Sequence, residues 1–535
     1  MYHQKMRNRL FYPISISLIL LGIFFRFQAL ANSGSYWYDE ILSIEFAQKP
    51  FLEMWQYLRS DTNPPLYYLL VGIWGRIFGF GEIAIRSSSL VWGILTIPAI
   101  YILANKLFDR KTGILAAVLY SLSTFAIYYS IDARMYSLLF FLITLSLYSF
   151  WTLIHQDRPY SKTALYSYFF FTLAALYVNI TAIWLLIAQG TYLLIKKRHY
   201  VLLFFTMPAI AILFLPWLWS LGNYFMELHR LGVLPSGWIF SFISSSPTLV
   251  DTPLSFLVLT TLRSIPSLFY ALYLLVILIL LFSSIQIKKE NTKQSFSLQL
   301  NNPREALLFC FLAFLIPLVL SAVTLNLPQS RYYIVSAVAF YILLARGLVE
   351  ILRNKNIFII LLRPLFLFGL TLVVVLTSLS IAHTGTPRGV WGDAATFIKE
   401  NNPDLVIVSP SGWVVTHYLE ESQFPLLVLR PPKNFPQSED PLQNTLKYSW
   451  SWERKNMDAD DERSLREQLQ YIPSDTSKIV YIYYIHSKKG EAVQILLEHM
   501  GFVCIKRFAQ RPFTRDGPHN IILMEREKRA DIPPC

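Results

Sequence analysis

The sequence predicts a polytopic α-helical membrane protein that ends in a water-exposed α/β domain, and its composition carries this prediction. Of the 535 residues, 54% are hydrophobic and 15% are charged, with a mean hydropathy of +0.42. Soluble globular proteins carry about 25% charged residues. The apolar residues form runs of about 20, the length that crosses a bilayer as a helix. After about residue 383 these runs stop. A single soluble domain and a disordered chain are both excluded.

About eleven spanning helices are expected. Their ranges are roughly 11–30, 87–105, 113–131, 136–154, 164–180, 181–195, 200–219, 266–285, 305–325, 332–349 and 357–381. One further apolar stretch, 64–80, begins Asn-Pro-Pro and contains Arg76. If this stretch spanned the membrane, every later basic connection would change side. The charge pattern therefore predicts that it lies along the outer interface or re-enters the membrane from that side.

The net charge of +13 belongs to the membrane part. Residues 384–535 contain 19 Lys and Arg against 20 Asp and Glu, and residues 1–383 contain 28 against 14. The basic residues of the membrane part cluster in short connections, for example around Lys111, Lys197 and Arg346. The positive-inside rule then places these connections and the N-terminus in the cytoplasm, with the C-terminal domain outside a plasma (inner) membrane. The charge is a topology signal and predicts no nucleic-acid partner.

The first apolar run is interpreted as an uncleaved membrane anchor, and a signal peptide is the alternative. A basic segment precedes the run, and Ala29-Leu30-Ala31 resembles a cleavage site. The position of Arg26 near the end of the run, the length of the run and the many spans that follow favour the anchor. In both cases the next segment is extracytoplasmic.

That outer segment, 32–86, holds six acidic residues close to the bilayer, where an ionised carboxylate is costly unless it is solvated, paired or bound to a cation. Asp39 and Glu40 follow an aromatic triplet. In the functional interpretation Asp39 is a general base that removes a proton from an acceptor, and Glu40 orients it or binds the acceptor. In the alternative, both acids are a solvated helix N-terminus, where negative charge is favourable.

Two further outer connections carry charged residues at membrane depth. Asp132 and Arg134 lie in a very short turn, either as a pair that neutralises itself or as groups facing Asp39, with Arg134 available for a phosphate. Arg331, followed by Tyr332, opens a late helix, either as an arginine that reaches the interface or as a phosphate clamp. The long outer loop, about 220–265, contains a His (His229) that is a surface or packing residue or a metal ligand.

The C-terminal part, 384–535, alternates helical and strand patterns, as in a small α/β domain. Strands are expected at 405–408, 426–429, 479–484, 502–508 and 520–526, and helices at 391–401, 459–471 and 488–500. No G-x-G-x-x-G fingerprint accompanies them, so a dinucleotide site is not expected. The domain binds the acceptor or caps the membrane part. Three cysteines are too few for a disulfide framework or a zinc site, and Cys504 is interpreted as a core residue.

The motifs of the membrane part, taken in order, resemble a known family. They are the aromatic-Asp-Glu loop, Asn-Pro-Pro-Leu-Tyr-Tyr, Phe-Gly-Phe-Gly-Glu-Ile-Ala-Ile-Arg, Tyr-Ser-Ile-Asp-Ala-Arg-Met-Tyr and Ser-Arg-Tyr-Tyr at 330–333. This order is similar to that of the bacterial GT-C fold membrane glycosyltransferases related to protein O-mannosyltransferases and lipid A aminoarabinose transferases. The resemblance covers about residues 1–383, and its specific motifs lie mainly in the first 140.

The resemblance implies an inverting glycosyltransferase that moves a sugar from a polyprenyl-phosphate donor to a lipid, glycan or protein acceptor on the outer face. It matches Asp39 to the catalytic base, Asp132 to an acidic position near the donor, and Arg331 to a basic residue near the lipid phosphate. Related sequences often have His before Pro-Pro-Leu where this chain has Asn63, a weaker metal ligand. The resemblance identifies no certain cofactor and leaves a divalent metal ion open, with Asp39, Asp132 and His229 as its candidate ligands.

Two other functions remain open at this point. A non-enzymatic flippase or transporter of lipid-linked sugars would also have many spans and a polar cavity, but its charged groups should lie near the middle of the membrane on interrupted helices. A polysaccharide polymerase or ligase would also act on the outer face. The clustering of Asp39 and Asp132 in outer connections favours the glycosyltransferase. No P-loop accompanies the spans, so an ATP-driven pump is not expected.

Overall fold

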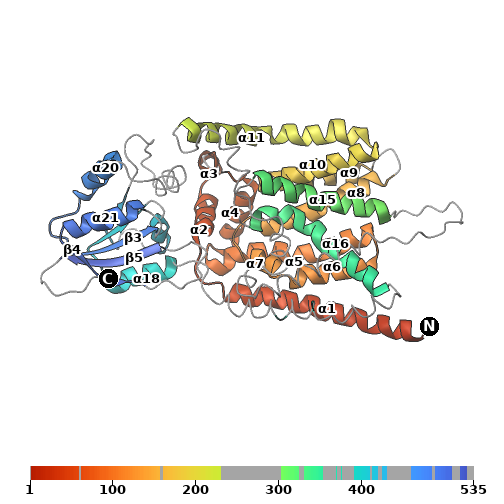
Figure 1. Ribbon diagram of the computed structural model, residues 1–535, viewed down its shortest axis with the longest axis horizontal. Helices are drawn as coiled ribbons and strands as arrows, with labels where there is room; N and C mark the ends of the chain where they lie inside the picture. Colours follow the sequence, from red (N-terminus) through yellow and green to blue (C-terminus); the bar gives the residue numbers. More distant parts are fainter. Residues whose placement is uncertain are drawn as a thin grey trace. The chain divides into compact units, whose positions relative to one another are not determined.

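The computed structural model describes residues 2–59, 62–156, 161–230, 303–324, 330–353, 391–409, 412–419, 424–429, 459–484, 488–508 and 519–526, with two isolated positions at 369 and 375. The chain divides into two compact units (Figure 1). The first, called the helical unit, contains Met1–Ala31, Asn63–Trp219 and Gly237–Thr384. The second, called the mixed unit, contains Asn32–Thr62, Ser220–Ser236 and Gly385–Cys535.

The helical unit contains the long apolar helices. Their bounds are α1 Tyr2–Ala31, α4 Leu66–Phe78, α5 Glu82–Leu107, α6 Arg110–Leu122, α7 Thr124–Ser130, α8 Tyr136–Ile154, α9 Lys162–Val178, α10 Ile183–Lys196, α11 Met207–Arg230 (up to Trp219 in this unit), α15 Pro303–Thr324 and α16 Ile334–Arg353, with the short helical segments η1 Ile180–Ala182, η2 Leu202–Thr206 and η4 Ser330–Tyr333. Six described segments are long and apolar enough to cross a membrane, or seven if the bent pair α6–α7 is one span. The chain is therefore a multi-pass membrane protein.

Large hydrophobic side chains lie on the outside of these helices as well as inside the bundle. Phe24 of α1, Phe170 of α9, and Phe205 and Trp219 of the η2–α11 segment are more than half exposed. A soluble protein rarely exposes so much apolar surface, whereas a lipid-facing helix requires it. The interior of the bundle is equally apolar, and α16 is buried along most of its length.

The predicted span 113–131 is broken in the structure. The helices α6 and α7 meet at Ser123 with a bend of 64°. Ser123 ends α6 and begins α7, where its hydroxyl accepts from the Ala126 N–H at 3.3 Å and contacts the Tyr341 hydroxyl of α16 at 2.8 Å. A serine at a helix start competes with the helical backbone for such bonds, which is a local reason for the break.

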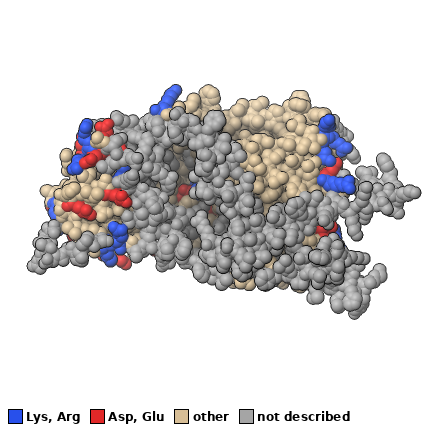
Figure 2. All heavy atoms as spheres, in the orientation of Figure 1, with Lys and Arg blue, Asp and Glu red and all other residues tan. Residues whose placement is uncertain are grey.

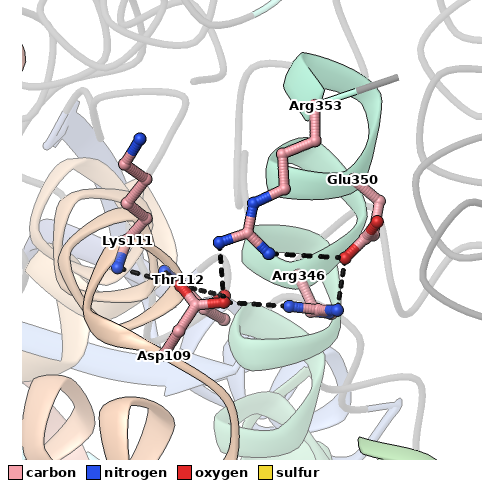
Figure 3. A network of polar contacts seen from close by, with 6 residues as sticks. All are labelled: Asp109, Lys111, Thr112, Arg346, Glu350 and Arg353. Atoms are coloured by element: carbon pink, nitrogen blue, oxygen red, sulfur yellow. Dashed lines mark hydrogen bonds and ion pairs between the residues drawn. The ribbon is translucent and has the colours of Figure 1, made fainter. Parts of the chain in front are cut away.

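Charged side chains gather at one end of the helical unit, and Figure 2 shows a broad surface without described charges beside them. Asp109 accepts hydrogen bonds from the Lys111 and Thr112 N–H groups at the start of α6 and pairs with Arg346 at 3.0 Å and Arg353 at 3.2 Å (Figure 3). Glu350 contacts the same two arginines. These residues belong to connections that the sequence predicts to be cytoplasmic, so the predicted clustering of basic connections is seen here.

The pKa of Asp109 reflects this network. Burial raises the pKa of the carboxyl, but the hydrogen bond from the Thr112 N–H and the charges of Arg353 and Arg346 together outweigh burial, so the pKa lies below its usual value. A second group at the ends of α8, α10 and α15 joins Glu305 to Lys196 at 2.8 Å and to His155 at 3.5 Å. Paired charges thus join the C-terminal ends of α8 and α10 to the N-terminal end of α15.

The mixed unit contains a five-stranded sheet with the order β2-β1-β3-β5-β4. The strands are β1 Leu405–Val408, β2 Leu426–Val428, β3 Lys478–Tyr484, β4 Phe502–Arg507 and β5 His519–Arg526. β1 pairs in parallel with β2 and β3, and β5 pairs antiparallel with β3 and β4. The core strands are short continuous apolar runs rich in β-branched and aromatic residues, a composition typical of buried strands.

Helices and a short turn complete the mixed unit. They are α2 Tyr38–Gln48, α3 Phe51–Leu58, α18 Trp391–Asn401, η5 Gly412–Tyr418, α20 Ala459–Leu469 and α21 Lys488–His499, together with the end of α11. Leu465, Leu469 and Leu497 of α20 and α21 pack with Ile407 and Ile479 of the sheet. Figure 1 shows α18 on the side of the sheet opposite α21. The C-terminal strands and helices lie within about two residues of their predicted positions.

One further prediction from the sequence differs from the structure. The segment 220–230 was expected in a loop, but α11 runs from Met207 to Arg230, so His229 lies in its last turn; the residues that break a helix, Gly232 and Pro235, come only afterwards in the sequence. Cys504 is buried, as expected for a core residue. The stretch 64–80 contains the short helix α4, and its predicted place at the outer interface stays a prediction. The predicted spans 266–285 and 357–381 fall almost entirely outside the described residues.

Candidate active site

The mixed unit holds the Asp-Glu pair at the start of α2. Trp37 is the N-cap of this helix, and the Trp37 N–H donates to the Glu40 carboxylate at 3.2 Å. Glu40 is fully buried, whereas Asp39 is partly exposed. The alternative interpretation of these two acids from the sequence is a helix N-terminus. The structure has a helix start here, and Glu40 makes the capping contact. Of the two acids, Asp39 is the partly exposed one, and Glu40 caps the helix start.

The aromatic triplet before this pair fixes the position of the helix start. Tyr36, Trp37 and Tyr38 are each at most 6% exposed. Burial of three aromatic rings in succession removes a large apolar area from water and holds the backbone in one path. Ser43 of the same helix donates to the Asp39 carbonyl at 2.8 Å. The backbone that carries Asp39 is thus held by buried aromatic rings on its N-terminal side and by the helix α2.

The helical unit holds the Asp132 and Arg134 turn between α7 and α8. Asp132 is fully buried and Arg134 is 6% exposed. The Arg134 N–H donates to the Asp132 carbonyl at 2.6 Å, and the Ser89 hydroxyl of α5 donates to the Arg134 carbonyl at 3.4 Å. Buried ionisable groups at the end of a membrane span are costly and are typical of functional sites. Both interpretations of the turn, a pair that neutralises itself and a donor site, stay predictions.

The aromatic residues beside the turn pack closely. The rings of Tyr128 and Tyr129 are 5.2 Å apart, and those of Tyr129 and Tyr136 are 4.8 Å apart. The Ser137 hydroxyl donates to the Tyr129 carbonyl at 2.7 Å. These contacts fasten the end of α7 to the beginning of α8, so the turn that contains Asp132 is held between two packed helices.

Arg331, Tyr332 and Asn63 also lie in the helical unit. Arg331 lies in η4, directly before α16, and its guanidinium lies 5.4 Å from the centre of the Tyr332 ring. The Ser321 hydroxyl of α15 donates to the Tyr332 carbonyl at 3.1 Å. Arg331, Tyr332 and Asn63 are each partly exposed. Asn63 lies directly before the proline pair that leads into α4.

Asp39 and Asp132 belong to different units, so their predicted juxtaposition stays a prediction. His229 is exposed and lies in the last turn of α11. Across the described parts of the chain, no three His, Cys, Asp or Glu side chains form a group able to hold a metal ion. Divalent cations require several such ligands. The three predicted metal ligands therefore do not form a described site, and no step below uses a metal.

The sequence missed the role of Arg26. This residue of α1 is fully buried inside the helical unit. Its guanidinium donates to the Tyr120 carbonyl at 3.2 Å, to the Ser121 carbonyl, to the Gly22 carbonyl at 2.9 Å and to the Ser130 hydroxyl at 3.1 Å. The carbonyls of Tyr120 and Ser121 are those that the break at Ser123 leaves at the end of α6. A charged residue inside a spanning helix is itself the signal that identifies it.

Arg26 therefore caps the end of a broken helix inside the membrane part. Cations stabilise helix C-termini, and unsatisfied carbonyl groups cost several kcal/mol where water is absent. The other half of the break, α7, ends in Ser130, which Arg26 also contacts. Arg26 thus links α1 to both α6 and α7, immediately before the turn that contains Asp132.

Comparisons with known proteins agree with this architecture. Residues 62–219 match the family model described as dolichyl-phosphate-mannose-protein mannosyltransferase. The fold is similar to that of ArnT from Cupriavidus metallidurans bound to undecaprenyl phosphate, with a TM-score of 0.54 and 12% identity over 95% of this chain and 97% of that one. For apo ArnT the TM-score is 0.52 at 13% identity, over 97% and 98% of the two chains.

A third structure is the Archaeoglobus fulgidus oligosaccharyltransferase in complex with Zn and sulfate, with a TM-score of 0.52 and 14% identity over 94% of this chain and 72% of that one. No curated protein sequence matches the chain. The chain therefore has the GT-C fold of these membrane glycosyltransferases, and the resemblance predicted from its sequence is confirmed.

Proposed function

We propose that the chain is an inverting glycosyltransferase that moves a sugar from a polyprenyl-phosphate carrier to an acceptor at the outer face of the membrane. One observation carries the proposal: the fold matches ArnT over nearly the whole of both chains, and that protein has been solved with undecaprenyl phosphate bound. The family match of residues 62–219 to a dolichyl-phosphate-mannose mannosyltransferase supports the same donor class. The acceptor is a lipid, a glycan or a protein.

The outer face is supported by the distribution of charge. The paired basic residues around Asp109 and Glu305 lie at one end of the helical unit, and the positive-inside rule assigns that end to the cytoplasm. This assignment favours an extracytoplasmic mixed unit, in which Asp39 would meet the acceptor.

Asp39 is proposed as the general base. Its carboxylate accepts the proton of the acceptor hydroxyl or amine, and the acceptor atom forms a bond to the anomeric carbon of the sugar. The bond between that carbon and the phosphate oxygen breaks, and the polyprenyl phosphate leaves with the bonding electron pair. Attack opposite to the leaving group inverts the anomeric configuration. Glu40, buried at the same helix start, orients α2.

Arg134 and Arg331 are proposed to stabilise the negative charge that develops on the leaving phosphate. A guanidinium binds two phosphate oxygens through parallel N–H donors, and preorganised donors of this kind contribute strongly to transition-state stabilisation. Asp132 is proposed to lie beside the donor, with Tyr332 and Asn63 as further polar contacts. The backbone of Arg134 is held in the turn by the hydrogen bond from its N–H to the Asp132 carbonyl.

The test is a comparison of envelope glycans and glycolipids by mass spectrometry, in cells with the gene, without it, and with Asp39→Asn. The variant keeps the size of the side chain and removes its basicity. We expect one sugar addition that disappears both without the gene and in Asp39→Asn, with the unmodified acceptor accumulating. A product that persists in the Asp39→Asn strain would contradict Asp39 as the base.

The break between α6 and α7 favours a second candidate, a transporter or flippase of lipid-linked sugars, because transporters often use interrupted spans with buried polar groups. The contacts of Arg26 weigh against it, since its donors are taken up by the carbonyls of the broken helix and by Ser130. Transbilayer movement of a fluorescent lipid-linked sugar in vesicles separates the two functions. The glycosyltransferase transfers the sugar without accelerating that movement.

A further inference from the structure

The segment that carries Asp39 belongs to the same compact unit as the C-terminal sheet, although more than 350 residues separate them in sequence. Within this unit the turn η5 contacts three elements: the helix α2, the helix α18 and the strand β3. Val414 and Val415 of η5 are fully buried. η5 is therefore anchored in the α/β domain through its apolar residues and reaches α2 with its last residues.

Two polar contacts join the end of η5 to the first outer segment. The Tyr36 N–H donates to the Tyr418 hydroxyl at 2.6 Å, and the His417 Nδ1 lies 3.1 Å from the Glu45 Oε1. These contacts lie on either side of Asp39, one before the start of α2 and one two turns into it. A helix held at both places cannot rotate or slide without breaking one of them.

Packing reinforces the two polar contacts. The ring of His417 lies 6.0 Å from the ring of Tyr36 in an edge-to-face arrangement. Tyr36 is 1% exposed. In α18, a Cβ atom added to Gly392 would come within 2.9 Å of the Ser35 Cβ, so glycine there permits the close approach of the segment before Tyr36. Two elements of the C-terminal domain, η5 and α18, thus approach the first outer segment closely.

We infer that the C-terminal α/β domain positions α2, and that His417 and Tyr418 are positioning residues which fix the orientation of the Asp39 carboxylate. This assignment rests on the proposed function, and it gives the domain a role distinct from binding the acceptor or capping the membrane part. A general base acts only within hydrogen-bond reach of the proton it removes, and a displacement of about 1 Å can lower the rate roughly 100-fold.

The double variant His417→Phe/Tyr418→Phe tests this role in the full-length protein in nanodiscs. It keeps both rings and removes both polar contacts. The single variant His417→Gln keeps a hydrogen-bond donor toward Glu45. Arg466→Gln is the matched control, because it removes an exposed ion pair with Glu462 on α20, at 2.7 Å, in the same unit but on another helix.

The first readout is hydrogen exchange of the α2 backbone amides, with β3 as a check that the sheet remains folded. We expect roughly ten-fold or more faster exchange in α2 for the double variant, because two hydrogen bonds are lost, and unchanged exchange in β3. His417→Gln and Arg466→Gln should retain the slow exchange of α2. Unchanged exchange of α2 in the double variant would overturn the inference.

The second readout is sugar transfer from a synthetic polyprenyl-phosphate mannose. We expect kcat to fall roughly ten-fold or more in the double variant, with the KM for the donor unchanged and with most of kcat retained in His417→Gln. Faster hydrogen exchange of the α2 amides together with a wild-type kcat would also overturn the inference. The proposed function fails separately, through full activity of Asp39→Asn, and that result leaves the exchange measurement intact.

Discussion

At the scale of single residues, neighbouring side chains of the same type have different environments. Asp39 and Glu40 are adjacent, but Glu40 is buried and accepts from the Trp37 N–H, whereas Asp39 is partly exposed. The sequence predicted Asp39 as the general base and Glu40 as the residue that orients it or binds the acceptor, but it could not show which carboxylate is buried, because a helix start accommodates an acid at either position. Only the direction of each side chain, which the packing of the aromatic triplet sets, separates a capping group from a candidate base.

Arg26→Met should destabilise the helical unit. The substitution keeps an apolar stem of similar length and removes every donor to Tyr120, Ser121 and Ser130. We expect a loss of about 3 kcal/mol or more, since hydrogen bonds from charged groups contribute roughly 1.5–3 kcal/mol each, seen as a lower thermal unfolding midpoint in detergent. Arg26→Lys should recover only part of it, because its single ammonium cannot span the carbonyls.

The exposed arginine Arg198 provides the control for Arg26. Arg198→Met should leave the midpoint within experimental error, as is usual for surface substitutions. Equal midpoints for Arg26→Met and Arg198→Met would mean that the broken helix does not depend on the buried guanidinium.

Asp404 gives a pH-dependent prediction for the C-terminal sheet. Its carboxylate accepts from the Ser477 N–H and hydroxyl at 2.8 Å and from the Lys478 N–H at 2.9 Å. The Ser477 N–H, then its hydroxyl, hold the pKa of Asp404 below the usual value. Because the pKa is lower in the folded than in the unfolded chain, the stabilisation is present above the unfolded pKa and is lost as the pH falls through the folded one.

The measurement is the thermal midpoint of the mixed unit between about pH 7 and pH 3, a range that includes the usual Asp pKa of about 3.9. Asp404→Asn should lower the midpoint near neutrality and reduce its fall on acidification. Parallel curves for the variant and the wild-type chain would contradict a role for this carboxylate.

At the scale of elements, the sequence predicts regular segments well and interruptions poorly. The strand β1 and the helices α8 and α18 have their predicted bounds, because hydrophobic periodicity is a local property. The break at Ser123 was not predicted, since Ser-Leu-Ser-Thr within an apolar run is also compatible with a continuous helix. The bend is accompanied by contacts from residues distant in sequence. Arg26 binds the Ser121 carbonyl near the end of α6, and Tyr341 contacts the Ser123 hydroxyl.

Two glycines give a test of the packing around this break. A Cβ atom added to Gly22 of α1 would overlap Ser121 of α6, and one added to Gly93 of α5 would overlap Ser130 of α7. Gly22→Ala and Gly93→Ala should each destabilise the helical unit by about 1–3 kcal/mol, the usual cost of overpacking. The comparison is a thermal unfolding midpoint for each variant in the same detergent.

Gly222 of α11 is the matched control, because nothing lies within 4 Å of its added Cβ. Gly222→Ala should leave the midpoint unchanged or raise it, since Ala is favoured over Gly within a helix by about 1 kcal/mol. The packing account fails if Gly22→Ala and Gly93→Ala behave like this control.

At the scale of the whole molecule, the charge distribution predicted a membrane part and a C-terminal domain, and it did not predict which unit the first outer segment joins. Residues 32–62 belong to the mixed unit. No local pattern encodes that association, because the contacts of Tyr36 and Glu45 are made with residues near 417. The candidate residues were identified from their type and place in the sequence. Their arrangement depends on such long-range packing.

The membrane sidedness gives a prediction at this scale. Gly81 and Arg110 are both exposed and lie at opposite ends of the span that α5 forms. In Gly81→Cys the thiol should react with a membrane-impermeant maleimide in intact cells, and in Arg110→Cys only after the membrane is opened. The native Cys310 is buried and should not interfere. Labelling of both positions from the same side would overturn the proposed topology.

The central claim is the transfer of a sugar from a polyprenyl-phosphate donor with Asp39 as the base, and its most direct test is release of polyprenyl phosphate by the purified chain in nanodiscs. With a synthetic polyprenyl-phosphate sugar and membrane-extracted acceptor, the wild-type chain should release polyprenyl phosphate in step with glycosylated product of inverted anomeric configuration. Asp39→Asn should bind the donor and release at most about 1% as much, in line with the 10²–10⁴-fold contribution of a general base. Undiminished release by Asp39→Asn, or product that retains the donor configuration, would contradict the account.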